Sequence, residues 1–129
     1  MNRTLVTVLG IACALLSVGV AARVQPSAED ERRDAITLMR AVNTAEAATA
    51  QRSADHKYAP LLELIDHSAM GRVRSDIAVS GSAVTYKGAQ VRLALAADAT
   101  QYIVTSVSAS GVAAFTNERG VIYTGEALK

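Results

Sequence analysis

The fold is decided by the last third of the chain, VRLALAADATQYIVTSVSASGVAAFTNERGVIYTG (residues 91–125). Short runs rich in β-branched and aromatic residues alternate there with residue pairs that favour turns. The predicted strands are Val91–Leu95, Tyr102–Val107, Val112–Thr116 and Val121–Thr124. Their connections are too short for parallel crossovers, so the pattern predicts an antiparallel meander. A further short strand is predicted at Val84–Tyr86, and a weaker one before it that includes Val73, Ile77 and Val79.

A long amphipathic helix is predicted to begin after Ser27, a suitable N-cap residue, and to continue to about Ala50. Its apolar stripe consists of Ala35, Leu38, Met39, Val42 and Ala45. Glu46 projects close to this stripe and is expected at the edge of the buried face. Pro60 is expected at the first turn of a short second helix, with Gly71 at its end. The predicted fold class is therefore α+β, with one long helix on a small antiparallel sheet.

Composition limits both the core and the choice of partners. The chain has 129 residues, which suits one domain, and it has no Trp. Its core is expected to consist of Ala, Val, Leu and Ile, with Phe115 and a few tyrosines as the large side chains. The 13 basic and 12 acidic residues are interspersed, which gives no basic stripe and predicts no nucleic-acid partner.

Residues 1–22 have the organisation of a signal peptide or signal anchor. Arg3 precedes an apolar run from Leu5 to Ala22 that ends in small residues. This run is near the lower length limit for crossing a bilayer, so both cleavage and retention as a membrane anchor stay open. Cys13 is the only cysteine and lies inside the run, so a cleaved chain would have no disulfide. We expect an exported protein, either periplasmic or secreted, or anchored to the inner membrane by this segment.

The rest of the chain is expected to comprise a connector, residues 23–27, and an α+β domain, residues 28–129. Four stretches of this domain resemble the globular headgroup of type IV pilins and pseudopilins. They are Leu38–Glu46, Tyr58-Ala-Pro-Leu-Leu62 with Leu64, Tyr102-Ile-Val-Thr105 and Phe115-Thr-Asn-Glu-Arg-Gly-Val-Ile-Tyr123. The last is similar to the aromatic-Thr-Asp-x-x-Gly-Val-Ile hairpin common in the family, with Asn117 in place of the Asp. The resemblance implies an envelope or secreted protein with a pilin-like head.

The usual prepilin signal is absent from the sequence. Family members enter a filament through a Gly-Phe-Thr-Leu-Ile-Glu-type signal that leads into an apolar helix continuous with the headgroup helix. Here Leu15 stands where the Glu would fall, and Pro26 interrupts the connection. The resemblance therefore implies a head used for binding or accessory work. The alternative is a minor pseudopilin or pilus subunit that keeps its N-terminal anchor.

Candidate chemistry is sparse. Asp66-His67-Ser68 contains the residue types of a hydrolase triad, but triad members meet through the fold and adjacent residues rarely face one another. His56 with Asp55, and His67 with Asp66, could together supply metal ligands, although exposed polar residues at a helix end explain both pairs equally well. We predict no catalytic residue, cofactor or metal. A small exported enzyme that uses His56 or His67 is kept as an alternative.

Two loops are candidates for an interaction surface. The residues predicted for this interaction surface are Arg72, Arg74, Asn117, Glu118 and Arg119. The last three belong to an expected hairpin tip with Gly120 at positive φ. The four tyrosines could form a sugar-binding or adhesive face, but strand periodicity favours sheet packing for Tyr102 and Tyr123. The sequence thus predicts a noncatalytic protein that acts by contact with a protein partner in the cell envelope, or with a surface.

Overall fold

The computed structural model describes residues 24–128. The predicted signal or anchor, residues 1–22, lies outside this range. The helical elements are α1 (Ala28–Arg52), α2 (Leu61–Leu64), η1 (Ser68–Met70) and η2 (Arg74–Asp76). The strands are β1 (Ile77–Ser80), β2 (Ala83–Tyr86), β3 (Ala89–Leu95), β4 (Tyr102–Val107), β5 (Val112–Asn117) and β6 (Tyr123–Glu126).

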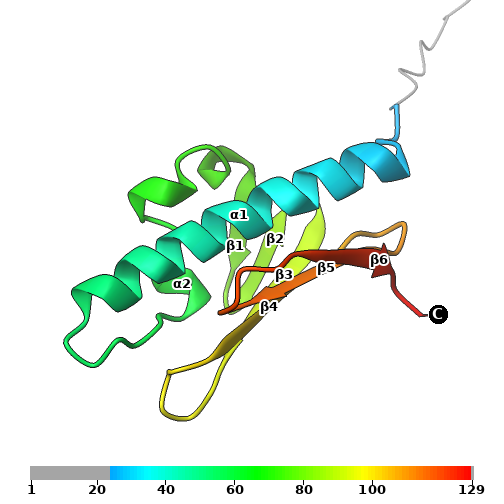
Figure 1. The fold of residues 1–129 in the computed structure, drawn as a ribbon. Helices are drawn as coiled ribbons and strands as arrows, with labels where there is room; N and C mark the ends of the chain where they lie inside the picture. The colour runs from blue at the N-terminus through cyan, green and yellow to red at the C-terminus, as the bar shows by residue number, and fades with distance from the viewer. Residues whose placement is uncertain (1–23, 129) are drawn as a thin grey trace, which may run out of the picture.

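The strands form a six-stranded antiparallel sheet in the order β1-β2-β3-β4-β5-β6. Each strand therefore pairs with its neighbour in the sequence, as a meander does. One long helix, α1, crosses one face of this sheet (Figure 1). The α+β class and the antiparallel meander are thus confirmed. None of the helices in residues 24–128 has the length and apolar character needed to span a membrane.

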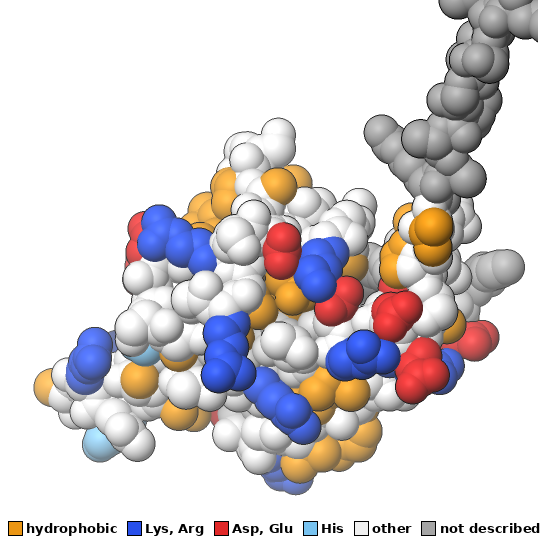
Figure 2. Space-filling model, turned by 90° about the horizontal axis from the view of Figure 1, so that it is seen from above, with side chains coloured by type: hydrophobic (Ala, Val, Ile, Leu, Met, Phe, Trp, Pro, Cys, Tyr) orange, Lys and Arg blue, Asp and Glu red, His pale blue; other side chains and the backbone are white. Residues whose placement is uncertain are grey.

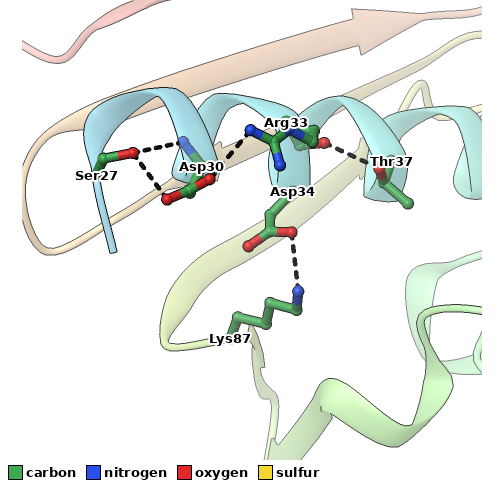
Figure 3. A network of polar contacts seen from close by, with 6 residues as sticks. All are labelled: Ser27, Asp30, Arg33, Asp34, Thr37 and Lys87. Atoms are coloured by element: carbon green, nitrogen blue, oxygen red, sulfur yellow. Dashed lines mark hydrogen bonds and ion pairs between the residues drawn. The ribbon is translucent and has the colours of Figure 1, made fainter. Parts of the chain in front are cut away.

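The start of α1 follows the predicted capping chemistry (Figure 3). The hydroxyl of Ser27 accepts a hydrogen bond from the backbone N–H of Asp30, at 3.1 Å, and donates to the Asp30 carboxylate at 2.8 Å. One turn later, Asp34 accepts a hydrogen bond from Lys87, with 2.8 Å between Oδ1 and Nζ. Because Lys87 follows β2, this ion pair ties the first turns of α1 to the sheet.

The apolar stripe of α1 packs on the inner face of the sheet as predicted. Leu38, Met39 and Val42 are almost completely buried, and each such side chain contributes roughly 1.5–3 kcal/mol through burial. Their partners on the sheet include Val91 and Val104, which alternate with outward-facing neighbours along β3 and β4. The alternation places the hydrophobic core between α1 and the sheet.

Three expectations about packing are wrong. Glu46 does not lie at the edge of the buried face, because its exposed fraction is 0%. Phe115 is not a core residue, because its exposed fraction is 44%. Of the two tyrosines expected to pack in the sheet, Tyr102 is buried, whereas Tyr123 has an exposed fraction of 50%. Phe115 alternates with the buried Ala114 and Thr116, so strand geometry turns its side chain to the other face.

Two predicted strands also begin later than expected. Val73 is buried, but it lies in a turn before η2, and β1 starts at Ile77. Val121 precedes β6, because its carbonyl accepts a hydrogen bond from the Thr116 hydroxyl, at 3.0 Å, in the connection after β5. The second helix begins directly after Pro60, which is its N-cap residue, but it ends at Leu64 and not at Gly71. Gly71 instead caps the separate turn η1, which ends at Met70.

Candidate contact surface on the open face of the sheet

The sheet face opposite α1 carries exposed apolar side chains. In β4, Ile103 and Val107 alternate with the buried residues Val104 and Ser106 and have exposed fractions of 53% and 38%. In β5, Phe115 has the same outward orientation. We use the term outer-face patch for Ile103, Val107, Phe115 and Tyr123.

Strand register brings the two aromatic residues of this patch together. Phe115 lies opposite Tyr123 in the ladder between β5 and β6. Their rings are stacked, with 4.6 Å between centroids and an angle of 13° between planes. The same row continues through Thr105 in β4 to Arg92 in β3. The result is an aromatic platform with a cationic residue two strands away.

The predicted hairpin tip borders this patch. Asn117 lies opposite Ile103 in the ladder, and its side-chain oxygen accepts a hydrogen bond from the backbone N–H of Arg119 at 3.1 Å. Gly120 has φ of +74°, which confirms the expected left-handed conformation. Arg119 is exposed and Glu118 is partly exposed. The Asn117–Arg119 part of the predicted surface therefore continues the outer-face patch.

The other two predicted residues are at a different edge. Arg74 lies in η2, directly before the edge strand β1, and its guanidinium pairs with the Asp66 carboxylate at 2.6 Å. Arg72 is exposed in the preceding turn. Because four strands separate β1 from β6, Arg72 and Arg74 do not join the hairpin tip in one surface.

The charged groups of the α1 side form no single basic or acidic surface. Lys and Arg side chains are spread along this side, and Asp and Glu side chains gather towards the start of the helix (Figure 2). The acidic residues include Glu31, which accepts hydrogen bonds from the hydroxyls of Ser108 and Ser110. Negative charge at this end also suits the positive end of the helix dipole.

Within residues 24–128, Asp66 and His67 do not pair with each other, and neither histidine belongs to a cluster of metal-ligating side chains. The Asp66 carboxylate faces Arg74, whereas Nδ1 of His67 accepts a hydrogen bond from the backbone N–H of Ala69, at 3.1 Å. Asp66 therefore does not orient His67 as a triad aspartate would. His56 is exposed in the turn after α1. Within residues 24–128, no three His, Cys, Asp or Glu side chains lie together as metal ligands would.

A polar layer between α1 and the sheet was not predicted. The Tyr102 hydroxyl donates to the side-chain oxygen of Asn43 at 2.8 Å, and the Asn43 amide nitrogen donates to Thr116 Oγ1 at 2.8 Å. Burial, with the charge of Glu46 as a second cause, raises the pKa of the Tyr102 phenol. This layer links the middle of α1 to β4 and β5.

Glu46 lies near this layer. Its Oε2 accepts a hydrogen bond from the backbone N–H of Ala59 at 2.9 Å, while Oε1 is buried without a hydrogen-bond partner within the described range. Burial raises the pKa of Glu46 to about 7, against the lowering effect of the Ala59 bond. The carboxyl therefore changes charge near neutral pH.

The outer-face patch could have been recognised in part from β4. Tyr102-Ile-Val-Thr-Ser-Val107 has apolar residues at both odd and even positions, so the strand must present apolar side chains on both faces. The stacking of Phe115 on Tyr123 requires the register between β5 and β6, and the sequence does not specify that register closely. Composition and strand periodicity alone predict packing roles for both residues.

Comparison of the chain with protein-family models, with curated proteins and with solved structures found no match. The resemblance to pilin headgroups therefore stays a prediction based on the order and local pattern of the residues.

Proposed function

We propose that this protein is a noncatalytic, exported protein of the cell envelope, in which a pilin-like head acts by contact with another protein. The outer-face patch is the contact surface in this proposal, with the hairpin tip Asn117–Arg119 at its border. The apolar segment Leu5–Ala22 supports export, and the arrangement of one helix on a meander is compatible with a pilin-like head.

The observation that carries the proposal is the exposure of the stacked pair Phe115 and Tyr123. Aromatic side chains are enriched in the centres of protein interfaces, where they bury a large area and lose little conformational entropy. Ile103 and Val107 extend the apolar area on the neighbouring strand. A stable core does not need these side chains on its outer side, so a binding role explains their position.

Fractionation tests the export part of the proposal. The intact mass and N-terminal residue would be measured for the protein from soluble envelope, membrane and cytoplasmic fractions. A soluble chain that begins near Arg23 would support a free head, and a membrane chain that retains Leu5–Ala22 would support a tethered one. A full-length chain confined to the cytoplasm would overturn the proposal.

Site-specific crosslinking tests the contact surface. A photoreactive phenylalanine analogue would replace Phe115 in living cells, and a matched chain would carry it at Thr37, which is exposed on α1. The proposal expects a discrete envelope adduct from position 115 that excess purified head suppresses. A head with Phe115→Ser and Tyr123→Ser should not suppress it. Equal adducts from both positions, or none from position 115, would exclude this surface.

The filament-subunit alternative predicts a different crosslinking result. A minor pseudopilin would retain Leu5–Ala22 and give adducts with pilins or with components of a secretion system. The enzyme alternative requires His56 or His67 to meet an acidic side chain in a cleft, and the Asp66 carboxylate pairs with Arg74 instead of His67.

A further inference from the structure

A groove lies where β3 continues past the first residues of β2. It has a volume of about 640 Å³, within the range of ordinary ligand sites. Its lining comes from the start of α2, from Ser82 in the turn before β2, from β2 itself and from β3: residues 60–62, 82–85 and 90–94. The hairpin of β3 and β4 extends beyond the short strands β1 and β2 towards the loop at the bottom of Figure 1.

The β3 edge in this groove has backbone groups without a strand partner. β2 pairs with β3 from Val84 opposite Val91 to Tyr86 opposite Ala89, whereas β4 pairs with β3 as far as Leu95. No described residue of β2 therefore lies opposite Leu93 or Leu95.

The direction of these backbone groups follows from the ladder with β4. The Ala96 N–H donates to the Gln101 carbonyl at 2.9 Å. In an antiparallel ladder, residues two apart share the same direction, so Ala94 and Arg92 also turn their N–H and C=O towards β4. Leu93 and Leu95 turn theirs the opposite way, towards the side that β2 does not cover; Leu93 also lines the groove, and Leu95 lies just beyond its lining. An unpaired edge of this kind is a template for another strand.

The side chains around the groove restrict what could bind. Leu62 is 50% exposed although it is apolar, and Arg92 is the single charged residue among the lining residues. Arg92 has no ion-pair partner within residues 24–128. Because neighbouring residues of a strand point to opposite faces, a bound strand could place an apolar side chain near Leu62 and an acidic one near Arg92.

We propose that this groove binds an extended peptide segment of a partner protein, which adds to the β3 edge beyond β2 and alternates apolar with acidic side chains. Backbone hydrogen bonds to Leu93 and Leu95 supply affinity in this mode, and the flanking side chains supply specificity. The free edge is about three residues or 10 Å long, which suits a short segment. This site does not depend on the outer-face patch, so either proposal can fail alone.

The test uses the folded head and the synthetic peptide acetyl-Ser-Val-Glu-Val-Glu-Ser-amide. Amide NMR shifts and hydrogen exchange would be followed during titration. The proposal expects saturable shifts and slower exchange at Leu93 and Leu95. Two control peptides accompany it: one is methylated at the backbone nitrogens of both valines and of the final serine, and the other has Lys in place of both Glu. The methylated form should not bind, and the Lys form should bind at least tenfold more weakly.

Protein variants locate the binding. Leu62→Asp and Arg92→Glu, both exposed positions, should each weaken binding at least tenfold. Arg40→Glu on the exposed side of α1 makes the same change of charge as Arg92→Glu and should have no effect. Phe115→Ser should also have no effect, which separates this site from the proposed contact surface.

Three outcomes would overturn the proposal. The first is the absence of shifts at Leu93 and Leu95 with both the Glu and the Lys peptide at millimolar concentration. The second is equal binding of the methylated peptide, which would show that the backbone is not recognised. The third is a change at these amides with protein concentration alone, which would assign the groove to a second copy of this chain.

Discussion

Glu46 and Ala59 are joined by a buried hydrogen bond between the α1 carboxylate and the backbone N–H before α2, with 2.9 Å between Oε2 and N. The bond fixes the returning chain against the helix. Glu46 is thus an ionisable residue with an exposed fraction of 0%. The negative charge of Glu63 adds to the rise in the pKa of Glu46 that burial causes.

The raised pKa of Glu46 predicts that folding stability falls as pH rises. The folded pKa is about 7 and the ordinary value is 4.5. The unfolded chain therefore releases the proton at lower pH than the folded chain, so the stabilising contribution of protonated Glu46 is complete below about pH 4.5, is lost as pH rises through 7 and then stays constant. The resulting decrease in the free energy of unfolding is at most about 3 kcal/mol. Urea unfolding at pH 5 and pH 8, followed by circular dichroism, measures it.

Glu46→Gln provides the control for this prediction. The amide oxygen can still accept from Ala59, but the side chain does not ionise. The free energy of unfolding of this variant should change less between pH 5 and pH 8 than that of the parent, and it should be higher than the parent's at pH 8. Glu63→Gln, at an exposed position, should leave most of the pH dependence of the free energy of unfolding unchanged. A parent protein that is equally stable at both pH values would show that the Glu46 pKa is not raised.

Tyr102→Phe is expected to lower the free energy of unfolding by about 1–3 kcal/mol. The change removes the donor to Asn43 Oδ1 and leaves that oxygen unpaired between helix and sheet. Tyr123→Phe removes the same hydroxyl from a half-exposed side chain and should change stability by less than about 0.5 kcal/mol. Chemical denaturation of both variants gives the comparison, and equal effects would contradict a role for the Asn43 bond.

Phe115 and Tyr123 should be coupled in a double-mutant cycle. Stacked aromatic pairs contribute about 0.5–1.5 kcal/mol beyond area burial, and the same coupling energy is expected between Phe115→Ala and Tyr123→Ala. Thermal unfolding of the four proteins measures it. Additive single effects would show that the rings do not stack in solution, and the aromatic platform would then lose its physical basis.

Gly88→Ala should destabilise the protein by roughly 1–2 kcal/mol, because the turn between β2 and β3 holds Lys87 at φ +47° and Gly88 at φ +82°. An added Cβ at Gly88 would meet no atom within 4 Å, so the effect is conformational and not steric. Gly125→Ala also meets open space but has no positive φ, and it should be close to neutral. Similar losses at both sites would contradict this explanation.

Local sequence signals were sufficient for most of the elements. The Ser27 cap and the stripe from Ala35 to Ala45 predicted α1, because capping and helical periodicity depend on residues within a few positions. Alternation and turn residues predicted the meander with β4 at its observed bounds. The start of β6 was missed because the bond from Thr116 to Val121 depends on how the loop folds back.

The candidate sites were predicted less well than the fold. Of the proposed interaction residues, Asn117, Glu118 and Arg119 border the outer-face patch, whereas Arg72 and Arg74 lie at the other edge. The groove beside Leu93 was not predicted at all. It exists because β2 is shorter than β3 and because α2 lies beside the part of β3 that β2 does not cover.

The sequence by itself determined the class of the fold, the order of its strands and the apolar face of α1, because these follow from periodicity and short connections. Only the tertiary structure decided that Glu46 is buried against Ala59, that Phe115 stacks on Tyr123, and that the β3 edge is open. Each of these depends on strand register, strand length or the path of a loop. Such features are set by contacts between residues far apart in the chain, and a local pattern does not contain them.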